Sequence, residues 1–207
     1  DAEQFSSGVQ GLMLDPNGFN ELKLCRTGPL IFNKNDWPIG TSLKVYGEFS
    51  WSEVRIFEQL VRPGMLVVDG GANIGCHTVR FSQLVGPQGK VLAFEPQRIA
   101  FQTLCANLML NNCTNVHAYH AALGAKNGTV VVPVRDQYKP DNFGGVPLNG
   151  VTEGETVGIA KLDVLELPIC GFIKADLEGM EAEFLDGAKE TITRCRPVMY
   201  LEGDGEQ

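Results

Sequence analysis

The sequence of 207 residues lacks the features that mark membrane-spanning, secreted and nucleic-acid-binding proteins. No apolar run reaches the roughly 20 residues that a helix needs to cross a bilayer. Residues 1–4 do not show the basic and then apolar order of a signal peptide, and since no initiator Met precedes them we expect a trimmed chain. Lys and Arg number 17 against 25 acidic residues, and the net charge of −8 argues against nonspecific binding to nucleic acids or anionic membranes.

The sequence also has no Cys-x-x-Cys pair, although it contains six cysteines. Their scattered positions favour free thiols in a reducing cytoplasm over a disulfide framework or a thiolate metal site. The length fits one domain with a full hydrophobic core. We therefore expect a cytoplasmic globular protein without a resident metal.

The dinucleotide fingerprint Gly-x-Gly-x-x-Gly is absent too, but a related glycine-rich loop occupies residues 69–75. It follows the β-rich apolar run 65–68 and precedes a segment whose apolar side chains recur at helical spacing. Strand, turn and helix N-terminus thus come in the order of a nucleotide-type binding loop, in which Gly71 and Gly75 allow a tight turn and the close approach of a ligand. The carboxylate of Asp69 argues against a pyrophosphate and suits a ligand that is cationic or rich in hydroxyl and amino donors.

A second acidic residue, Glu95, ends the next predicted strand. It lies about one βαβ step after the loop, where a carboxylate can accept hydrogen bonds from both hydroxyls of a ribose. NAD and S-adenosylmethionine both carry such a ribose. The loop reads Asp-x-Gly-x-Asn-x-Gly, close to the acidic-x-Gly-x-Gly-x-Gly loop of class I S-adenosylmethionine-dependent methyltransferases, with Asn73 in place of the middle glycine. This cofactor has no phosphate, so the helix N-terminus can face its methionine carboxylate. NAD-dependent redox chemistry is the weaker alternative.

Several segments, taken in order, resemble the FkbM-type methyltransferases and together span roughly Trp37 to Glu202. These segments are 46–53, 67–75, 93–96, 172–181, 187–188 and 196–202. Gly70 and Ala175 stand where this family usually has larger aliphatic residues, but both keep small apolar character. The resemblance implies the class I methyltransferase fold, S-adenosylmethionine as cofactor, and a hydroxyl on a sugar or natural product as acceptor.

The order of the expected elements indicates an α/β fold, a Rossmann-like three-layer αβα sandwich around a mostly parallel sheet. The expected core strands are 65–69, 90–95, 115–122, 170–175 and 197–202, and the expected helices are 52–61, 74–86, 98–111 and 180–192. An insertion at 124–168 holds strands at 129–134 and 156–162. Residues 1–45 form an N-terminal β-rich extension with a hairpin at 20–32, and residues 46–207 form the methyltransferase domain. We expect the C-terminal antiparallel hairpin that usually closes this fold to be absent.

The candidate site residues come from the carboxyl ends of the predicted strands, where parallel sheets bind ligands. Asp69, Glu95 and Asp176 fall there, and a sulfonium and an amino group would relieve the repulsion between their carboxylates. The predicted cofactor contacts are Glu48, Asp69, Gly71, Ala72, Asn73, Gly75, Glu95, Pro96, Ala122 and Asp176. The candidates for the general base are Asp176, Glu178 and His77. As alternatives, the three strand-end acids could be helix N-caps or solvated loop residues, and the cluster at 176–181 could hold a divalent metal or only favour the start of a helix.

The sequence therefore predicts an S-adenosylmethionine-dependent O-methyltransferase that acts on a small-molecule or glycan acceptor and binds neither nucleic acid nor membrane. The alternative is a non-catalytic domain that binds S-adenosylmethionine or a nucleoside within a larger assembly. The acceptor, the base and the oligomeric state are left open by the sequence.

Overall fold

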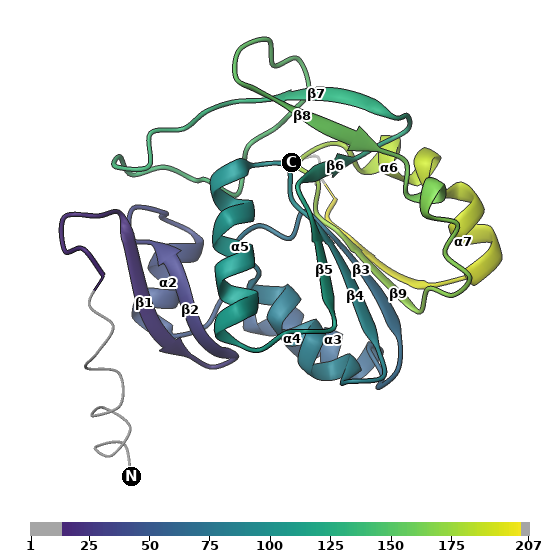
Figure 1. Cartoon of the computed structure of the whole chain (residues 1–207), viewed down its shortest axis with the longest axis horizontal. Helices are drawn as coiled ribbons and strands as arrows, with labels where there is room; N and C mark the ends of the chain where they lie inside the picture. The colour runs from purple at the N-terminus through teal and green to yellow at the C-terminus, as the bar shows by residue number, and fades with distance from the viewer. Residues whose placement is uncertain (1–13, 204–207) are drawn as a thin grey trace.

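The centre of the structure is a five-stranded sheet in which every strand runs parallel to its neighbours (Figure 1). The computed structural model describes residues 14–203, so residues 1–13 of the expected extension and the end of the expected domain lie outside the described residues. The sheet has the order β10-β9-β3-β4-β5. Its strands are β3 (Leu66–Gly70), β4 (Lys90–Phe94), β5 (Val116–Tyr119), β9 (Phe172–Ala175) and β10 (Val198–Leu201). All of β3 is buried, as expected for a parallel strand covered on both faces, which explains the apolar run of Leu66, Val67 and Val68.

Helices cover both faces of this sheet and complete the predicted three-layer α/β fold (Figure 1). One face carries α3 (Trp51–Leu60), α4 (Cys76–Val85) and α5 (Arg98–Leu110), and the other carries α6 (Glu181–Gly187), α7 (Lys189–Cys195) and the short 3-10 helix η1 (Leu162–Leu165). The predicted fold class is confirmed. Within residues 14–203, none of the helices combines the length and apolar character that crossing a bilayer requires.

The prediction of a single helix over 180–192 is wrong, because the segment forms two helices that meet at Ala188. The carboxylate of Asp163, in η1, accepts the backbone N–H groups of Glu190 (2.9 Å) and Thr191 (2.8 Å). These bonds satisfy the first free donors of α7 and so start a second helix. The apolar spacing of the sequence carries no sign of this contact, which comes from 27 residues away.

The prediction of one strand over 115–122 is also wrong, because the chain changes sheets at His120. Strand β5 ends at Tyr119, and β6 (Ala121–Leu123) joins a separate three-stranded sheet of order β6-β8-β7. The His120 ring stacks on Phe101 with ring centroids 5.0 Å apart, and its Nε2 lies 3.0 Å from the Pro96 carbonyl oxygen. The other strands, β7 (Gly128–Val132) and β8 (Glu155–Ala160), come from the expected insertion.

The N-terminal segment forms the predicted hairpin from β1 (Asn20–Cys25) and β2 (Gly28–Asn33), but it continues into a helix, α2 (Ile39–Tyr46), that the sequence analysis did not predict. The hairpin packs on α5 (Figure 1). The buried side chain of Asn107 joins them, since it accepts the N–H of Ile31 (2.6 Å) and donates to the carbonyls of Ile31 (2.9 Å) and Ile74 (2.8 Å). The hairpin is thereby fixed to the loop that precedes α4.

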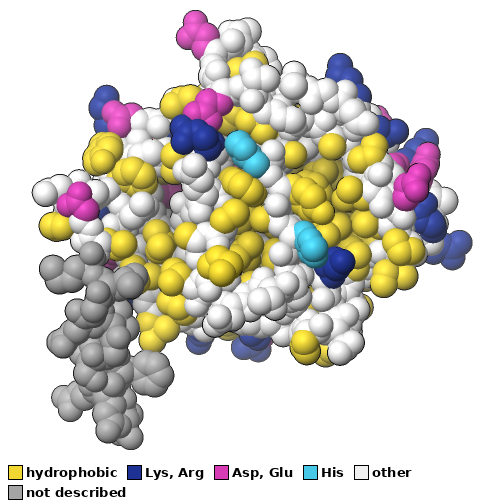
Figure 2. Space-filling model, viewed as in Figure 1, with side chains coloured by type: hydrophobic (Ala, Val, Ile, Leu, Met, Phe, Trp, Pro, Cys, Tyr) yellow, Lys and Arg dark blue, Asp and Glu magenta, His cyan; other side chains and the backbone are white. Residues whose placement is uncertain are grey.

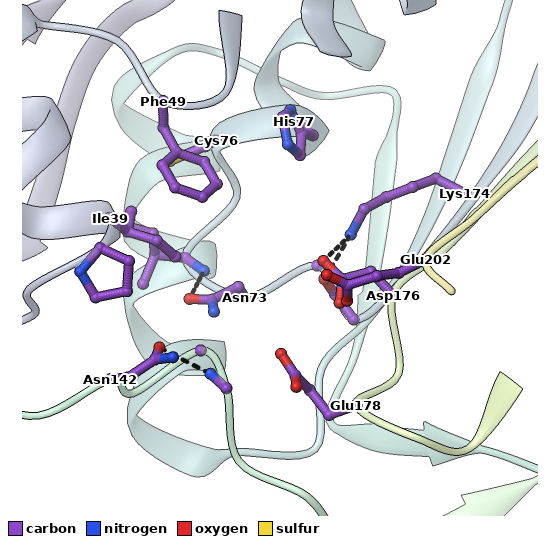
Figure 3. A pocket seen from close by; sticks show the side chains of 16 residues that line it. Ile39, Phe49, Asn73, Cys76, His77, Asn142, Lys174, Asp176, Glu178 and Glu202 are labelled. Carbon is purple, nitrogen blue, oxygen red and sulfur yellow. Dashed lines mark hydrogen bonds and ion pairs between the residues drawn. The ribbon is translucent and has the colours of Figure 1, made fainter. Parts of the chain in front are cut away.

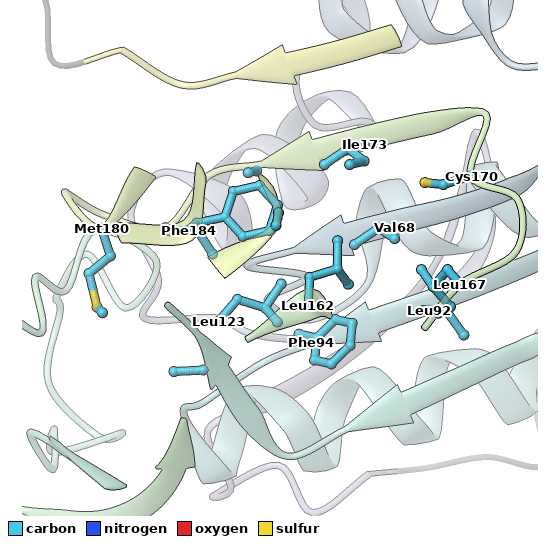
Figure 4. Close-up of a cluster of buried hydrophobic side chains, with 14 of the residues drawn as sticks. Val68, Leu92, Phe94, Leu123, Leu162, Leu167, Cys170, Ile173, Met180 and Phe184 are labelled. Carbon is cyan, nitrogen blue, oxygen red and sulfur yellow. The ribbon is translucent and has the colours of Figure 1, made fainter. Parts of the chain in front are cut away.

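The largest cluster of buried apolar side chains lies between the central sheet, α6 and the second sheet (Figure 4). Val68, Ile173 and Phe184 are fully buried within it, and Leu123 reaches it from β6. Burying one such side chain contributes about 1.5–3 kcal/mol, so this core holds the ends of β3 and β9 firmly beside each other. Their carboxyl ends carry the candidate site.

Candidate functional site

A cavity of about 200 Å³ opens at the carboxyl ends of the central strands (Figure 3). In Figure 3 the carboxylates of Asp176, Glu178 and Glu202 lie together on one side of it, opposite Phe49 and Ile39. A smaller cavity of about 40 Å³ adjoins it and is lined mainly by apolar side chains. Gly71, Gly144, Asp176 and Glu178 line both cavities. The two spaces are therefore neighbours that share one wall.

The glycine-rich turn passes very close to the end of β9. Gly71 has a φ of +69°, and a Cβ added there would lie 1.8 Å from the backbone oxygen of Asp176. Gly75, with a φ of +90°, precedes α4, and a Cβ there would lie 2.7 Å from Leu104 of α5. Only glycine fits both positions, because each combines a left-handed backbone with a close neighbour.

Lys174 is the positive centre of the site, and the sheet register places it there. Asp69 of β3 pairs with Lys174 of β9, whose buried ammonium lies 3.7 Å from Asp69 Oδ1 and 3.3 Å from Asp176 Oδ2. It also donates to the Gly71 carbonyl at 3.0 Å. Burial lowers the pKa of Lys174, but Asp69 and Asp176 raise it more, so the group stays charged. Asp69 itself is fully buried and accepts the Thr78 hydroxyl at 2.6 Å, so it lines neither cavity.

Three carboxylates converge beside this lysine. Oxygens of Asp176, Glu178 and Glu202 all lie within 4.8 Å of one another. The hydrogen bond with Asp176, followed by burial, raises the pKa of Glu202 to about 8. Burial raises the pKa of Asp176, but Lys174 and the bond to Glu202 hold it below its usual range. The pair therefore shares a proton near neutral pH, with Asp176 as the ionised member. The sequence analysis did not identify Glu202, although it ends a predicted core strand as the other acids do.

Glu95 faces the glycine-rich turn, as expected, but lines neither cavity. Its side chain is buried, and its two oxygens accept the backbone N–H groups of Asn73 and Gln97, each at 2.7 Å. Burial raises the pKa of Glu95 to about 7, although these hydrogen bonds and Lys174 oppose the rise. Glu95 thus fixes the turn, and its contact with a ribose stays a prediction.

His77 lines the larger cavity from the first turn of α4, and its side chain is 9 % exposed. Its Nε2 lies 3.2 Å from Oε2 of Glu53, which belongs to α3. The ring packs against Phe49, Phe57 and Phe81, with centroids 5.2–6.4 Å away. The sequence analysis did not identify Glu53, because nothing local to α3 indicates which neighbour it faces.

The remaining predicted contacts divide into residues at the cavities and one residue away from them. Ala72 and Asn73 line the larger cavity, and Pro96 and Ala122 line the smaller one. Glu48 lines neither, since its carboxylate pairs with Arg26 at 2.5 Å. Six of the ten predicted cofactor contacts thus line the cavities, whereas Glu48, Asp69, Gly75 and Glu95 do not.

Comparison with known protein families identifies the family of this chain. The family model of the FkbM methyltransferase domain matches residues 69–205, which is more than half of the chain and includes the glycine-rich turn, the three carboxylates and Lys174. The chain belongs to the FkbM methyltransferase family. Membership in this family makes S-adenosylmethionine the cofactor.

Relatives of this FkbM chain carry the same general name. It is 28% identical over 143 residues to Methyltransferase 1 of Beauveria bassiana, a match that covers 58% of this chain and 57% of that protein. It is 38% identical over 65 residues to Methyltransferase sdnD of Sordaria araneosa, covering 31% of this chain and 25% of that protein. The crystal structure of an FkbM methyltransferase from Methylobacillus flagellatus is 20% identical, with a TM-score of 0.49 over 72% of this chain and 40% of that one. The chain thus spans little more than half the length of the first relative.

The two cavities suit the chemistry of the family's cofactor. The smaller is lined by Phe94, Leu123 and Met180, as an adenine ring requires, and the larger is acidic, as a sulfonium and an amino group require. The shared wall contains Gly144, and a Cβ there would lie 2.9 Å from Nδ2 of Asn73. A larger residue at this position would therefore press on the side chain of Asn73, which lines the larger cavity.

Proposed function

We propose that this FkbM chain transfers the methyl group of S-adenosylmethionine to a hydroxyl of a sugar or natural product. The observation that carries the proposal is the convergence of His77, Asp176 and Glu178 on one cavity beside the glycine-rich turn. When bound, the cofactor supplies a methyl group that is electrophilic because it is attached to a positively charged sulfur. The protein must place the acceptor oxygen and remove its proton.

The residues of the site divide these tasks. Ala72, Asn73 and Asp176 would hold the polar part of the cofactor, and Pro96 and Ala122 would border the adenine. Lys174 holds Asp176 ionised next to the place where positive charge is bound.

A small or glycan acceptor agrees with the charge distribution better than a nucleic acid or a membrane. The net charge is −8, and on the face drawn in Figure 2 the Lys and Arg side chains are scattered among apolar and uncharged side chains and form no continuous basic patch. A polyanion needs a basic patch. The six cysteines, all free thiols, support a reducing cytoplasm as the setting.

Calorimetric titration with S-adenosylhomocysteine, and separately with NAD, tests the cofactor, and S-adenosylhomocysteine release on a panel of sugars and hydroxylated natural products tests the reaction. We expect binding of S-adenosylhomocysteine but not NAD, turnover with at least one hydroxyl acceptor, and loss of turnover in Asp176→Asn. Arg98→Gln, which removes an exposed ion pair with Glu155, is the control. Binding without turnover on any acceptor would favour the alternative of a non-catalytic binding domain.

A further inference from the structure

Glu53 and His77 form a hydrogen-bonded contact between α3 and α4 at the wall of the larger cavity. The contact joins Glu53 Oε2 to His77 Nε2 at 3.2 Å, and hydrogen bonds from Ser50 and Tyr200 hold the same carboxylate. An ionised carboxylate only accepts hydrogen bonds. The hydrogen bond with His77 is the main reason that the pKa of Glu53 lies below its usual range, so Glu53 is ionised at neutral pH. His77 therefore carries a proton on Nε2.

The other ring nitrogen of His77 is in an unusual position. Nδ1 is buried, and among residues 14–203 no side chain or backbone group forms a hydrogen bond with it. A buried acceptor without a partner destabilises a fold, and native proteins retain few such groups. With the proton on Nε2, Nδ1 keeps its lone pair, and the ring that carries it lines the same cavity as Asp176 and Glu178.

The neighbouring acids are less suited to accept a proton. Asp176 is paired with Lys174 and hydrogen-bonded to Glu202. Glu178 also takes part in an interaction. The groups that face His77 and its partner are Glu53 from α3, Lys174 from β9, Asp176 just after β9, and Tyr200 from β10.

We propose that Glu53 is a positioning residue for His77 and leaves Nδ1 as the general base of the cavity. This inference rests on the proposed function. As the acceptor oxygen forms its bond to the methyl carbon, the bond from that carbon to sulfur breaks and sulfur keeps the electron pair. The hydroxyl proton moves to Nδ1, and the resulting imidazolium is stabilised by the Glu53 carboxylate until water takes the proton.

The position of the proton can be measured without an acceptor. The chain has only three histidines, so His117→Gln and His120→Gln assign the imidazole nitrogen signals in a ¹⁵N NMR spectrum of the neutral protein. We expect the proton of His77 on Nε2 in the wild type and in Glu53→Gln, whose amide oxygen still accepts, but a mixture of tautomers in Glu53→Leu. Glu58→Gln is the matched control, because Glu58 also joins α3 to α4, through Arg80 at 2.7 Å, away from the cavity. A wild-type proton on Nδ1, or a Glu53→Leu spectrum like that of the wild type, overturns the inference.

Kinetics on the acceptor found by the panel test the role of Nδ1. We expect His77→Gln to lower kcat by about 10²–10⁴-fold, the usual contribution of general base catalysis, with the affinity for S-adenosylhomocysteine unchanged. Glu53→Gln should lower kcat by about tenfold, since it keeps the tautomer but loses the charge opposite the imidazolium. Glu58→Gln should match the wild type. An unchanged kcat in His77→Gln overturns this inference alone, whereas a wild type that does not bind S-adenosylhomocysteine overturns the proposed function.

Discussion

Replacing Gly71 with alanine tests the close approach between the glycine-rich turn and β9. The added Cβ would lie 1.8 Å from the backbone oxygen of Asp176, so one of the two segments must move by more than an ångström. Overpacking of this kind costs about 1–3 kcal/mol. The left-handed backbone at φ +69° adds about 1–2 kcal/mol for any residue with a Cβ. We therefore expect Gly71→Ala to lower the free energy of unfolding by about 2–5 kcal/mol.

Gly64→Ala separates the two contributions. Gly64 has a φ of +84°, but nothing lies within 4 Å of the place that an added Cβ would take, so only the backbone cost of about 1–2 kcal/mol applies. Urea unfolding of both variants gives the difference. At an m value of about 2 kcal/mol/M, the steric surplus corresponds to an additional fall of about 0.5–1.5 M in the unfolding midpoint of Gly71→Ala.

The same pair of variants should differ in cofactor binding. Gly71→Ala displaces Asp176 and should weaken the binding of S-adenosylhomocysteine measured by calorimetry. Gly64 precedes the amino end of β3, at the end of the strand opposite to the site, so Gly64→Ala should bind normally. If Gly71→Ala costs no more stability than Gly64→Ala and binds equally well, the turn does not press against β9 as the structure places it.

Three further predictions concern buried charges. Lys174→Met should lower the free energy of unfolding in urea by about 3–5 kcal/mol, because Asp69 then stays buried without a counter-charge. The double variant Lys174→Met/Asp69→Asn should recover much of this stability, and no recovery would refute the pairing of the two side chains. Asp163→Ala should lower the free energy of unfolding by about 1–2 kcal/mol, because it removes the cap of α7. Burial raises the pKa of Asp163, but the backbone N–H groups that it accepts lower this pKa more. The stabilisation is therefore present above the usual pKa range of aspartate and is lost as pH falls through the folded-state pKa, where the stabilities of variant and wild type should converge. Glu95 has its pKa raised from 4.5 to about 7, so wild-type stability should fall as pH rises between these values, by up to about 3 kcal/mol, and Glu95→Gln should lack that slope.

The fold was predictable because its signals are local. Strands β3, β4 and β9 of the central sheet are short, mainly apolar segments, and each is followed by a helix, which leaves a parallel sheet with helices on both faces as the simple solution. The glycine-rich turn was equally visible, since Gly71 and Gly75 follow directly after β3.

The features that the sequence did not predict depend on contacts between distant parts of the chain. The division of the last predicted helix depends on Asp163, and the end of β5 depends on the packing of His120 against α5. The pairing of Glu53 with His77 joins two helices whose relative rotation no periodicity specifies. In each case the sequence shows a polar residue without its partner.

The three strand-end acids show where the sequence rule itself stops. The rule places Asp69, Glu95 and Asp176 at one edge of the sheet, and the structure agrees, but only Asp176 lines a cavity. Successive side chains of a strand point to opposite faces, so the register of the strand decides whether an acid near its end faces the cavity or the packed interior. Strand β3 was expected to end at Asp69 but ends at Gly70, which turns Asp69 from a tip residue into a buried strand residue opposite Lys174. Asp69 then acts through Lys174, which it keeps charged, and Lys174 in turn keeps Asp176 ionised at the cavity. An acid at a strand end can thus serve the site by fixing the charge of another residue, and only the register between strands decides which role it has.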